Sequence, residues 1–406
     1  MKIPVFCRLL TVVIFSIVFN ACGTDNKPVD YTANEHRIED SLENQMVTVT
    51  GKKPLRLLTE RPYNLETPLK YFLHDLTPND VFFVRWHLPT PPAPVREDTF
   101  RLRISGNGAK NLALSLNDLK TKFTPYTITA VCACAGNARS FCNPKVPGAQ
   151  WVNGGMGNAA WTGVKLKDLL AAAGASPNTQ FVSFNGLDQP VFPSTPDFIK
   201  SLEYAHAMDG EVMIAYAMNG EPLPLLNGYP LKLVVPGWYA TYWVGMLSEI
   251  RLYRDSFKTY WMDSAYLIPK GVEYGNEQPG ALAKDRVPIN KLDVRSIFVW
   301  PEPGFVMKKG KTYTIQGLVM DDGTGISKVE ISSDKGNSWT EAKLNSSLGK
   351  YSWRRWKYSF TPTAEGTIEL LVKATNAAGA TQPQHHWNRS GYMRNEIESL
   401  SLIVQQ

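Results

Sequence analysis

The sequence predicts an α+β chain in which a mixed domain is followed by a β-sandwich. The chain has 406 residues, more than one ordinary hydrophobic core accommodates, so we expect two domains. Hydrophobic residues make up 43% and charged residues 20%, which is a globular composition. The apolar pattern changes near residues 281–290, from mixed helical and strand spacing to strand spacing alone. We therefore place the two domains at residues 54–283 and 284–406.

The N-terminus has the pattern of an export signal. Two basic residues, Lys2 and Arg8, precede the apolar run Leu9–Phe19, which is too short to cross a membrane comfortably. The Cys22 that follows a small residue resembles the acylation site of a bacterial lipoprotein. Residues 1–22 are predicted to be a lipoprotein signal peptide and the polar residues 23–53 a tether. The protein would then be periplasmic and touch the membrane only through a lipid. The alternative is a plain secretory signal with an incidental cysteine.

Two segments of the first domain have helical spacing. Leu116–Phe123 follows Ser115, a residue suited to cap a helix, and Thr162–Ala173 is amphipathic with Gly174 at its end. Other segments are short and apolar or alternate like strands, and these are residues 100–104, 125–134, 231–235 and 247–253.

The second domain has strands at short spacing with turn residues between them. Asp322-Gly323, Gly336-Asn337 and Gly379 supply turns. This pattern predicts an immunoglobulin-like β-sandwich, with strands at residues 312–319, 326–332, 353–360 and 367–374.

The cysteines of the first domain are the strongest chemical signal. Cys132 and Cys134 lie on one face of the strand 125–134, which ends at a Gly-Asn turn followed by Arg139. A thiol at a strand end beside a cation is suited to a lowered pKa. The alternatives are a small buried apolar residue or a zinc site with Cys142, although that set lacks a fourth ligand at the usual spacing. The odd cysteine count after signal removal disfavours a pure disulfide framework, and pairing of Cys132 with Cys142 stays open.

Three further segments have a binding composition. Arg85 and His87 alternate on an extended stretch, where they would hold an anion or form a surface ion pair. Residues 150–164 are rich in glycine, which permits close approach to a ligand or forms a flexible loop. Glycines and aromatics in residues 227–245 would form a wall for a flat heterocycle or pack in the core.

Taken in order, these motifs resemble the sulfite oxidase/sulfite dehydrogenase family of molybdopterin enzymes. The motifs are Phe-Val-Arg-x-His, Cys-Ala-Gly-Asn-x-Arg, Trp-x-x-Gly with Trp-x-Gly-Val, and Gly-Tyr-Pro-Leu-Lys-x-Val-Val-Pro-Gly. The second domain resembles the family's dimerisation domain through Ile326–Ser332 and Ser338-Trp339. The resemblance covers residues 54–406.

This resemblance implies a Mo-molybdopterin cofactor and assigns roles by position. Cys134 matches the molybdenum thiolate, a soft ligand for a redox metal. Arg85, Arg139, Trp151 and Tyr266 match the substrate pocket, and the last cation is Arg394, with Arg389 as the other candidate. Cofactor contacts match Phe83, Arg85, His87, Asp188, Asn227, Lys232, Trp243, Val244 and Gly245.

The chain also departs from the family pattern. Tyr242 and Gly245 replace an arginine and a lysine that serve the pterin phosphate in vertebrate-type members, which leaves Lys232 as the main cation there. The twin-arginine signal usual for exported members is not seen either.

The resemblance implies oxidation of sulfite to sulfate by a homodimer. No Cys-x-x-Cys-His motif occurs, so electrons would pass to a separate c-type cytochrome. The alternatives are a sulfoxide reductase or another molybdopterin oxidoreductase of the superfamily, and a non-catalytic lipoprotein binding module. The net charge of +6 is spread along the chain, which gives no support to nucleic-acid binding.

Overall fold

The computed structural model describes residues 46–406, except 50, 90–92 and 272–274. The predicted signal peptide, Cys22 and most of the predicted tether lie outside the described residues. Within the tether, β1 (Met46–Val47) pairs with β2 (Leu55–Glu60), and the Lys52 side chain is buried. The packed part of the chain therefore begins before Pro54. In the described residues, no helix has the length and apolarity needed to cross a membrane.

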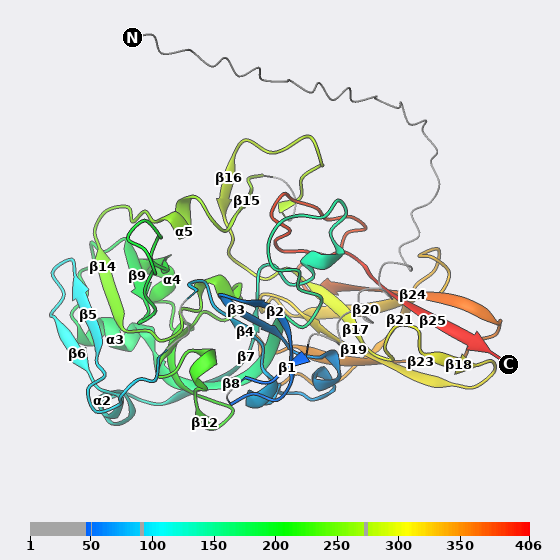
Figure 1. Ribbon diagram of the computed structural model, residues 1–406, viewed down its shortest axis with the longest axis horizontal. Helices are drawn as coiled ribbons and strands as arrows, with labels where there is room; N and C mark the ends of the chain where they lie inside the picture. Colours follow the sequence, from blue (N-terminus) through cyan, green and yellow to red (C-terminus); the bar gives the residue numbers. More distant parts are fainter. Residues whose placement is uncertain (1–45, 50, 90–92, 272–274) are drawn as a thin grey trace, which may run out of the picture.

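The first domain contains three sheets with few helices, as Figure 1 shows. The first sheet has the order β1-β2-β3-β4, the second β10-β9-β14-β5-β6 and the third β12-β11-β8-β7 with β13 beside β11. Its further strands are β3 (Tyr63–Glu66), β4 (Val84–Arg85), β5 (Leu102–Gly106), β6 (Leu112–Leu114), β7 (Tyr126–Ala133), β8 (Met156–Lys165), β9 (Phe181–Asn185), β10 (Ile199–Glu203), β11 (Met213–Met218), β12 (Glu221–Pro222), β13 (Lys232–Val234) and β14 (Glu249–Tyr253).

The helices are short and lie between the strands. They are η1 (Leu69–Leu73), η2 (Asn79–Val81), α2 (Leu116–Lys122), η3 (Arg139–Phe141), α3 (Leu166–Ala172), α4 (Tyr204–Ala207), η4 (Leu225–Asn227), η5 (Ala240–Tyr242) and α5 (Tyr260–Asp263). Helix α2 confirms the prediction, because the Ser115 and Asp118 side chains form a reciprocal capping box at its start. A hairpin of β15 (Leu267–Pro269) and β16 (Arg286–Pro288) leads to the second domain.

The second domain is the predicted β-sandwich, built from two sheets. One has the order β17-β19-β23-β22 and the other β18-β25-β24-β20-β21. Trp356, Val372 and Leu402 lie in the core between them. The strands are β17 (Arg295–Trp300), β18 (Val306–Lys308), β19 (Tyr313–Met320), β20 (Ile326–Ser332), β21 (Thr340–Glu341), β22 (Lys343–Leu344), β23 (Arg354–Phe360), β24 (Gly366–Asn376) and β25 (Glu398–Gln405).

The predicted helix at Thr162–Ala173 is wrong in its first part. Residues up to Lys165 belong to strand β8, and only α3 is helical. Strand β8 is paired on both sides, with β7 and with β11, so the sheet determines its conformation. Gly163 makes the pairing close, because an added Cβ would lie only 1.9 Å from the Ile214 carbonyl oxygen. Tertiary pairing has overridden the local helical spacing.

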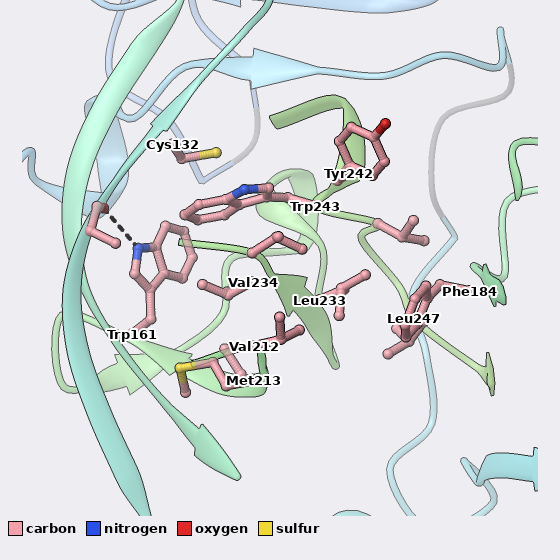
Figure 2. Packing of buried hydrophobic residues seen from close by; sticks show 14 of the residues in the cluster. Cys132, Trp161, Phe184, Val212, Met213, Leu233, Val234, Tyr242, Trp243 and Leu247 are labelled. Atoms are coloured by element: carbon pink, nitrogen blue, oxygen red, sulfur yellow. Dashed lines mark hydrogen bonds between the residues drawn. The ribbon is translucent and has the colours of Figure 1, made fainter. Parts of the chain in front are cut away.

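Aromatic side chains from β8 and from the residue after η5 pack against each other in the core of the first domain. Trp161 and Trp243 meet edge to face with ring centres 5.4 Å apart, and Cys132 lies next to Trp243 in Figure 2. The Trp161 indole donates a hydrogen bond to the Ala130 carbonyl at 3.1 Å, which satisfies its buried polar atom (Figure 2). This packing fixes the end of β7, where Cys134 begins a turn.

Candidate active site

Cys134 begins a turn, and both its backbone N–H and its carbonyl are hydrogen-bonded. Its N–H donates to the Gly155 carbonyl at 2.9 Å, and its carbonyl accepts from the Asn137 N–H at 3.0 Å. The Asn137 side chain accepts from the Gly155 N–H at 2.9 Å. The glycine-rich segment therefore supports the cysteine loop rather than forming a free surface loop. The three described cysteines are all free thiols, so the structure contains no Cys132–Cys142 disulfide.

Cys134 lines a pocket together with most of the predicted cofactor residues. Those lining it are Phe83, Arg85, His87, Cys134, Asp188, Asn227, Lys232, Trp243, Gly245 and Tyr266. Cys132 lines it too, which confirms that both thiols lie on one face of the strand. Burial raises the pKa of Cys132 to about 12, so this second thiol stays protonated. Val244 is buried beside the pocket without lining it.

Arg85, His87 and Tyr266 form a hydrogen-bonded group within this pocket. The Arg85 guanidinium donates to the Tyr266 hydroxyl at 3.2 Å, and His87 Nε2 lies 2.6 Å from the same oxygen. Burial, with the neighbouring Arg85 and Lys200 cations, holds the pKa of His87 well below its usual value. The Tyr266 hydroxyl accepts from Arg85, and the neutral His87 ring shares a hydrogen bond with the same hydroxyl. Arg85 and His87 thus contact the same hydroxyl group, and their joint role at the site stays a prediction.

The cofactor side of the pocket is rich in hydrogen-bond donors. Burial lowers the pKa of Lys232, and burial raises the pKa of Asp188 to about 6. The Thr241 hydroxyl is buried without a hydrogen-bond partner in the described part of the chain, although its residue lines the pocket. A Cβ on Gly228 would lie 2.8 Å from the Gly245 Cα, so the backbone itself forms part of the wall. Together with a soft thiol at Cys134, these donors fit a phosphorylated heterocycle that carries a metal.

Four predicted substrate residues lie outside the pocket lining. Arg139 donates to the Ser390 carbonyl at 2.9 Å and to the Ala149 carbonyl at 3.1 Å. Trp151 is fully buried and meets Phe83 edge to face with ring centres 6.1 Å apart.

The two late arginines are engaged in ion pairs. Arg389 pairs with Glu277, whereas Arg394 is buried between Glu396 and Glu398. Which of them serves the substrate stays a prediction.

Three residues that adjoin the pocket were missed at the sequence level. Lys52 donates to the Phe82 carbonyl at 3.1 Å and to the Asn227 side chain, but it sits in a polar segment that gives no signal. Lys200 is buried on β10, and its ammonium lies 5.3 Å from the centre of the Tyr266 ring. A lysine at an inward position of a strand was a usable signal. Tyr392, from the second domain, stacks on Tyr266 with ring centres 5.2 Å apart.

Comparison with known proteins agrees with this geometry. Residues 87–261 match the family described as "Oxidoreductase molybdopterin binding domain", and residues 286–400 match "Mo-co oxidoreductase dimerisation domain". The chain is therefore a molybdopterin-binding oxidoreductase by domain composition.

Similar proteins show to which family of molybdopterin-binding oxidoreductases the chain belongs. Mitochondrial sulfite oxidase of Rattus norvegicus is 32% identical over 84% of this chain and 64% of its own length. Sulfite oxidase of Gallus gallus is 30% identical over 84% of this chain and 76% of its own. The crystal structure of the sulfane dehydrogenase SoxCD from Paracoccus pantotrophus covers 94% of this chain and 93% of its own, with 25% identity and a TM-score of 0.73. The chain belongs to the sulfite oxidase family, and it spans slightly under two thirds of the length of the mammalian relatives.

Proposed function

We propose that this chain oxidises sulfite to sulfate and passes the electrons to a separate acceptor. The observation that carries the proposal is the convergence of Cys134, Arg85 and Tyr266 in one pocket that also holds cofactor-type donors. Sulfite gains an oxygen atom from water and releases two electrons and two protons. The family relatives named sulfite oxidase support this substrate.

Molybdopterin, when bound, would supply a metal that accepts two electrons. Cys134 would hold the metal, while Lys232, Asn227 and Thr241 would hold the phosphate and the ring system. Phe82, Phe83 and Trp243 line the same pocket and exclude water from it.

The protein's own groups then act on the substrate. The Arg85 guanidinium attracts the oxyanion, and Tyr266 is oriented by its bonds to Arg85 and His87. Because burial and the neighbouring cations keep His87 neutral, its ring orients the Tyr266 hydroxyl without adding a charge to the site. These side chains thus provide binding and orientation.

The test is sulfite-dependent reduction of ferricyanide by purified protein, with molybdenum content measured by mass spectrometry. Cys134→Ser should lose more than about 99% of turnover, because a hydroxyl is a poor ligand for this metal. Cys142→Ser is the matched control, since Cys142 is also a buried free thiol but does not line the pocket. Full turnover of the Cys134 variant, or wild-type protein with molybdenum but no sulfite activity, would contradict the proposal.

We further propose a c-type cytochrome as acceptor and a homodimer as the working assembly. The net charge of +6 suits an acidic partner, and the dimerisation-domain match supports self-association. Sulfite-dependent reduction of cytochrome c and light scattering test the two points separately. A monomer at micromolar concentration would exclude the stable dimer.

The lipid-anchored periplasmic location is also a proposal, supported by the N-terminal pattern that ends at Cys22. Labelled palmitate should be incorporated by the full chain and not by its Cys22→Ser variant. Equal labelling of both would reject acylation at this cysteine.

A further inference from the structure

A loop of the β-sandwich domain docks directly on the cysteine loop of the first domain. The Met393 N–H donates to the Ala135 carbonyl at 2.8 Å, one residue after Cys134. The Arg139 guanidinium donates to the Ser390 carbonyl at 2.9 Å. In Figure 1 this red loop, which precedes β25, lies beside the teal loop that follows β7. The second domain therefore contributes backbone to the surroundings of the proposed metal ligand.

The docked loop is held in one conformation by Asn388. Its side-chain oxygen accepts from the backbone N–H groups of Ser390 and Tyr392, at 3.2 and 3.1 Å. Its amide nitrogen donates to the Tyr392 carbonyl at 2.8 Å and to the Gly275 carbonyl at 3.1 Å. Gly391 has a φ of 59°, and a Cβ there would lie 2.8 Å from the Arg139 Cγ. The Tyr392 backbone is therefore fixed close to Arg139.

The Tyr392 ring lies between two residues predicted to serve the substrate. It is nearly parallel to the Tyr266 ring, with an interplanar angle of 19° and centres 5.2 Å apart. The Arg139 guanidinium carbon lies 5.1 Å from the centre of the Tyr392 ring. An aromatic stack and a cation over a ring each contribute attraction that an aliphatic side chain does not.

The Tyr392 hydroxyl takes no part in holding this arrangement. It has no hydrogen-bond partner in the described residues, whereas the Tyr266 hydroxyl has two. Burial, with the nearby Tyr266 hydroxyl, raises the pKa of Tyr392, so its ring stays uncharged at neutral pH. The contacts that involve Tyr392 and the site are therefore made by its ring.

We propose that Tyr392 is a positioning residue of the active site, supplied by the β-sandwich domain. Its ring holds the Tyr266 phenol against Arg85 and His87, and it holds the Arg139 guanidinium on its other side. This inference rests on the proposed function, and it deepens it by making oxyanion binding depend on the second domain. If the ring only filled space, an aliphatic side chain such as leucine would keep most of the packing and cost little in sulfite binding.

The experiment compares Tyr392→Phe and Tyr392→Leu in the molybdenum-loaded full chain. Loss of the stack and of the cation–ring contact should raise the KM for sulfite roughly tenfold in the leucine variant. The phenylalanine variant should stay within about twofold of wild type, because it keeps the ring. Tyr358→Leu is the control, since Tyr358 packs against the sandwich core. Molybdenum content and near-ultraviolet circular dichroism confirm that each variant is folded.

Calorimetric titration of sulfate gives a second readout that does not require turnover. Weaker sulfate binding in the leucine variant, but not in the phenylalanine variant, supports the inference even if wild-type protein fails to oxidise sulfite. Leucine behaving like wild type in both measurements overturns it. Phenylalanine as damaging as leucine also overturns it, because the role would then belong to the hydroxyl. Absence of sulfate binding by the wild-type protein would overturn the inference as well. If leucine variants lose molybdenum, sulfate titration of the phenylalanine variant still decides between ring and hydroxyl.

Discussion

Several residues around the pocket hold backbone conformations that non-glycine residues seldom adopt. Ala138, Tyr266 and Met393 have φ angles of 68°, 55° and 59°. Each adjoins the site: Ala138 follows the cysteine turn, Tyr266 lines the pocket and Met393 docks on Ala135. Such a conformation costs roughly 1 kcal/mol per residue and persists only where neighbours enforce it. The neighbours are the hydroxyl contacts and the Tyr392 ring for Tyr266, and backbone hydrogen bonds to the Val152 and Ala135 carbonyls for Ala138 and Met393.

His386 makes the docked loop sensitive to acid. Burial lowers its pKa from 6.5 to about 4, and its Nε2 faces the Asn388 amide at 3.2 Å. As the pH falls below 6.5, His386 becomes protonated in the unfolded chain, whereas in the folded chain it stays neutral until about pH 4. The unfolded state therefore binds more protons, and the free energy of unfolding falls across this pH range. Between pH 6.5 and 5, wild-type protein should lose about 2 kcal/mol more stability than His386→Gln. Urea unfolding at several pH values measures this.

The adjacent histidine provides the matched control for that experiment. His385→Gln changes an exposed side chain one residue away and should keep the wild-type acid dependence. Parallel curves for wild type and His386→Gln would show that His386 contributes nothing to the acid response.

Among the elements, strand β8 depends most on a single small residue. Gly163→Ala would place a methyl group 1.9 Å from the Ile214 carbonyl, so β8 and β11 would have to separate. We expect a loss of about 3 kcal/mol in the free energy of unfolding, measured with urea. Gly310→Ala is the control: its φ is 73° but no atom lies within 4 Å of the added group, so only about 1 kcal/mol should be lost. Equal losses for the two variants would mean that the methyl group at residue 163 is accommodated without separating β8 from β11.

The same strand shows how far local pattern predicts the elements. Where an element is defined locally, as in the capped α2 or the alternating β20, the prediction is confirmed. Residues 162–165 failed because their apolar positions serve two neighbouring strands, and helical spacing does not distinguish that case. Strands β17 and β25 were not predicted. They are buried on most positions, so they lack the alternation that identified the other sandwich strands.

At the scale of the whole molecule, a buried group of charged side chains in the sandwich reaches the first domain through a hydrogen bond from Arg295. Arg295 of the sandwich donates to the Asn153 side chain of the glycine-rich segment and pairs with Glu398 at 2.5 Å. Glu398→Gln would leave two buried arginines, Arg295 and Arg394, with less compensation and should cost about 3–5 kcal/mol. Thermal or urea unfolding measures this loss.

The exposed ion pair of Lys309 and Glu365 provides a control for the Glu398→Gln substitution. Glu365→Gln removes an exposed partner of Lys309 and should change stability by less than about 1 kcal/mol. If the two variants unfold alike, the buried Glu398 ion pairs contribute no more to stability than an exposed pair does.

The candidate site was predictable only where motifs lie within the first domain. Cys134, Arg85 and Lys232 were found from local sequence, and the structure brings them to one pocket. Tyr392 and Lys52 were not found, because their proximity to the site arises from contacts between distant segments. The role of Arg394 or Arg389 has the same difficulty, since neither position is fixed by a motif near the cysteine.

The docking of the loop at residues 388–393 on the cysteine loop has a consequence for biosynthesis. A ribosome completes the molybdopterin-binding domain and the sandwich strands through β24 before it makes this loop. Until the loop is synthesised and docked, Arg139 lacks its contact with Ser390 and Tyr266 lacks its stacking partner. The surroundings of the cysteine loop are therefore complete only after translation has passed residue 393, so the site depends on nearly the whole length of the chain.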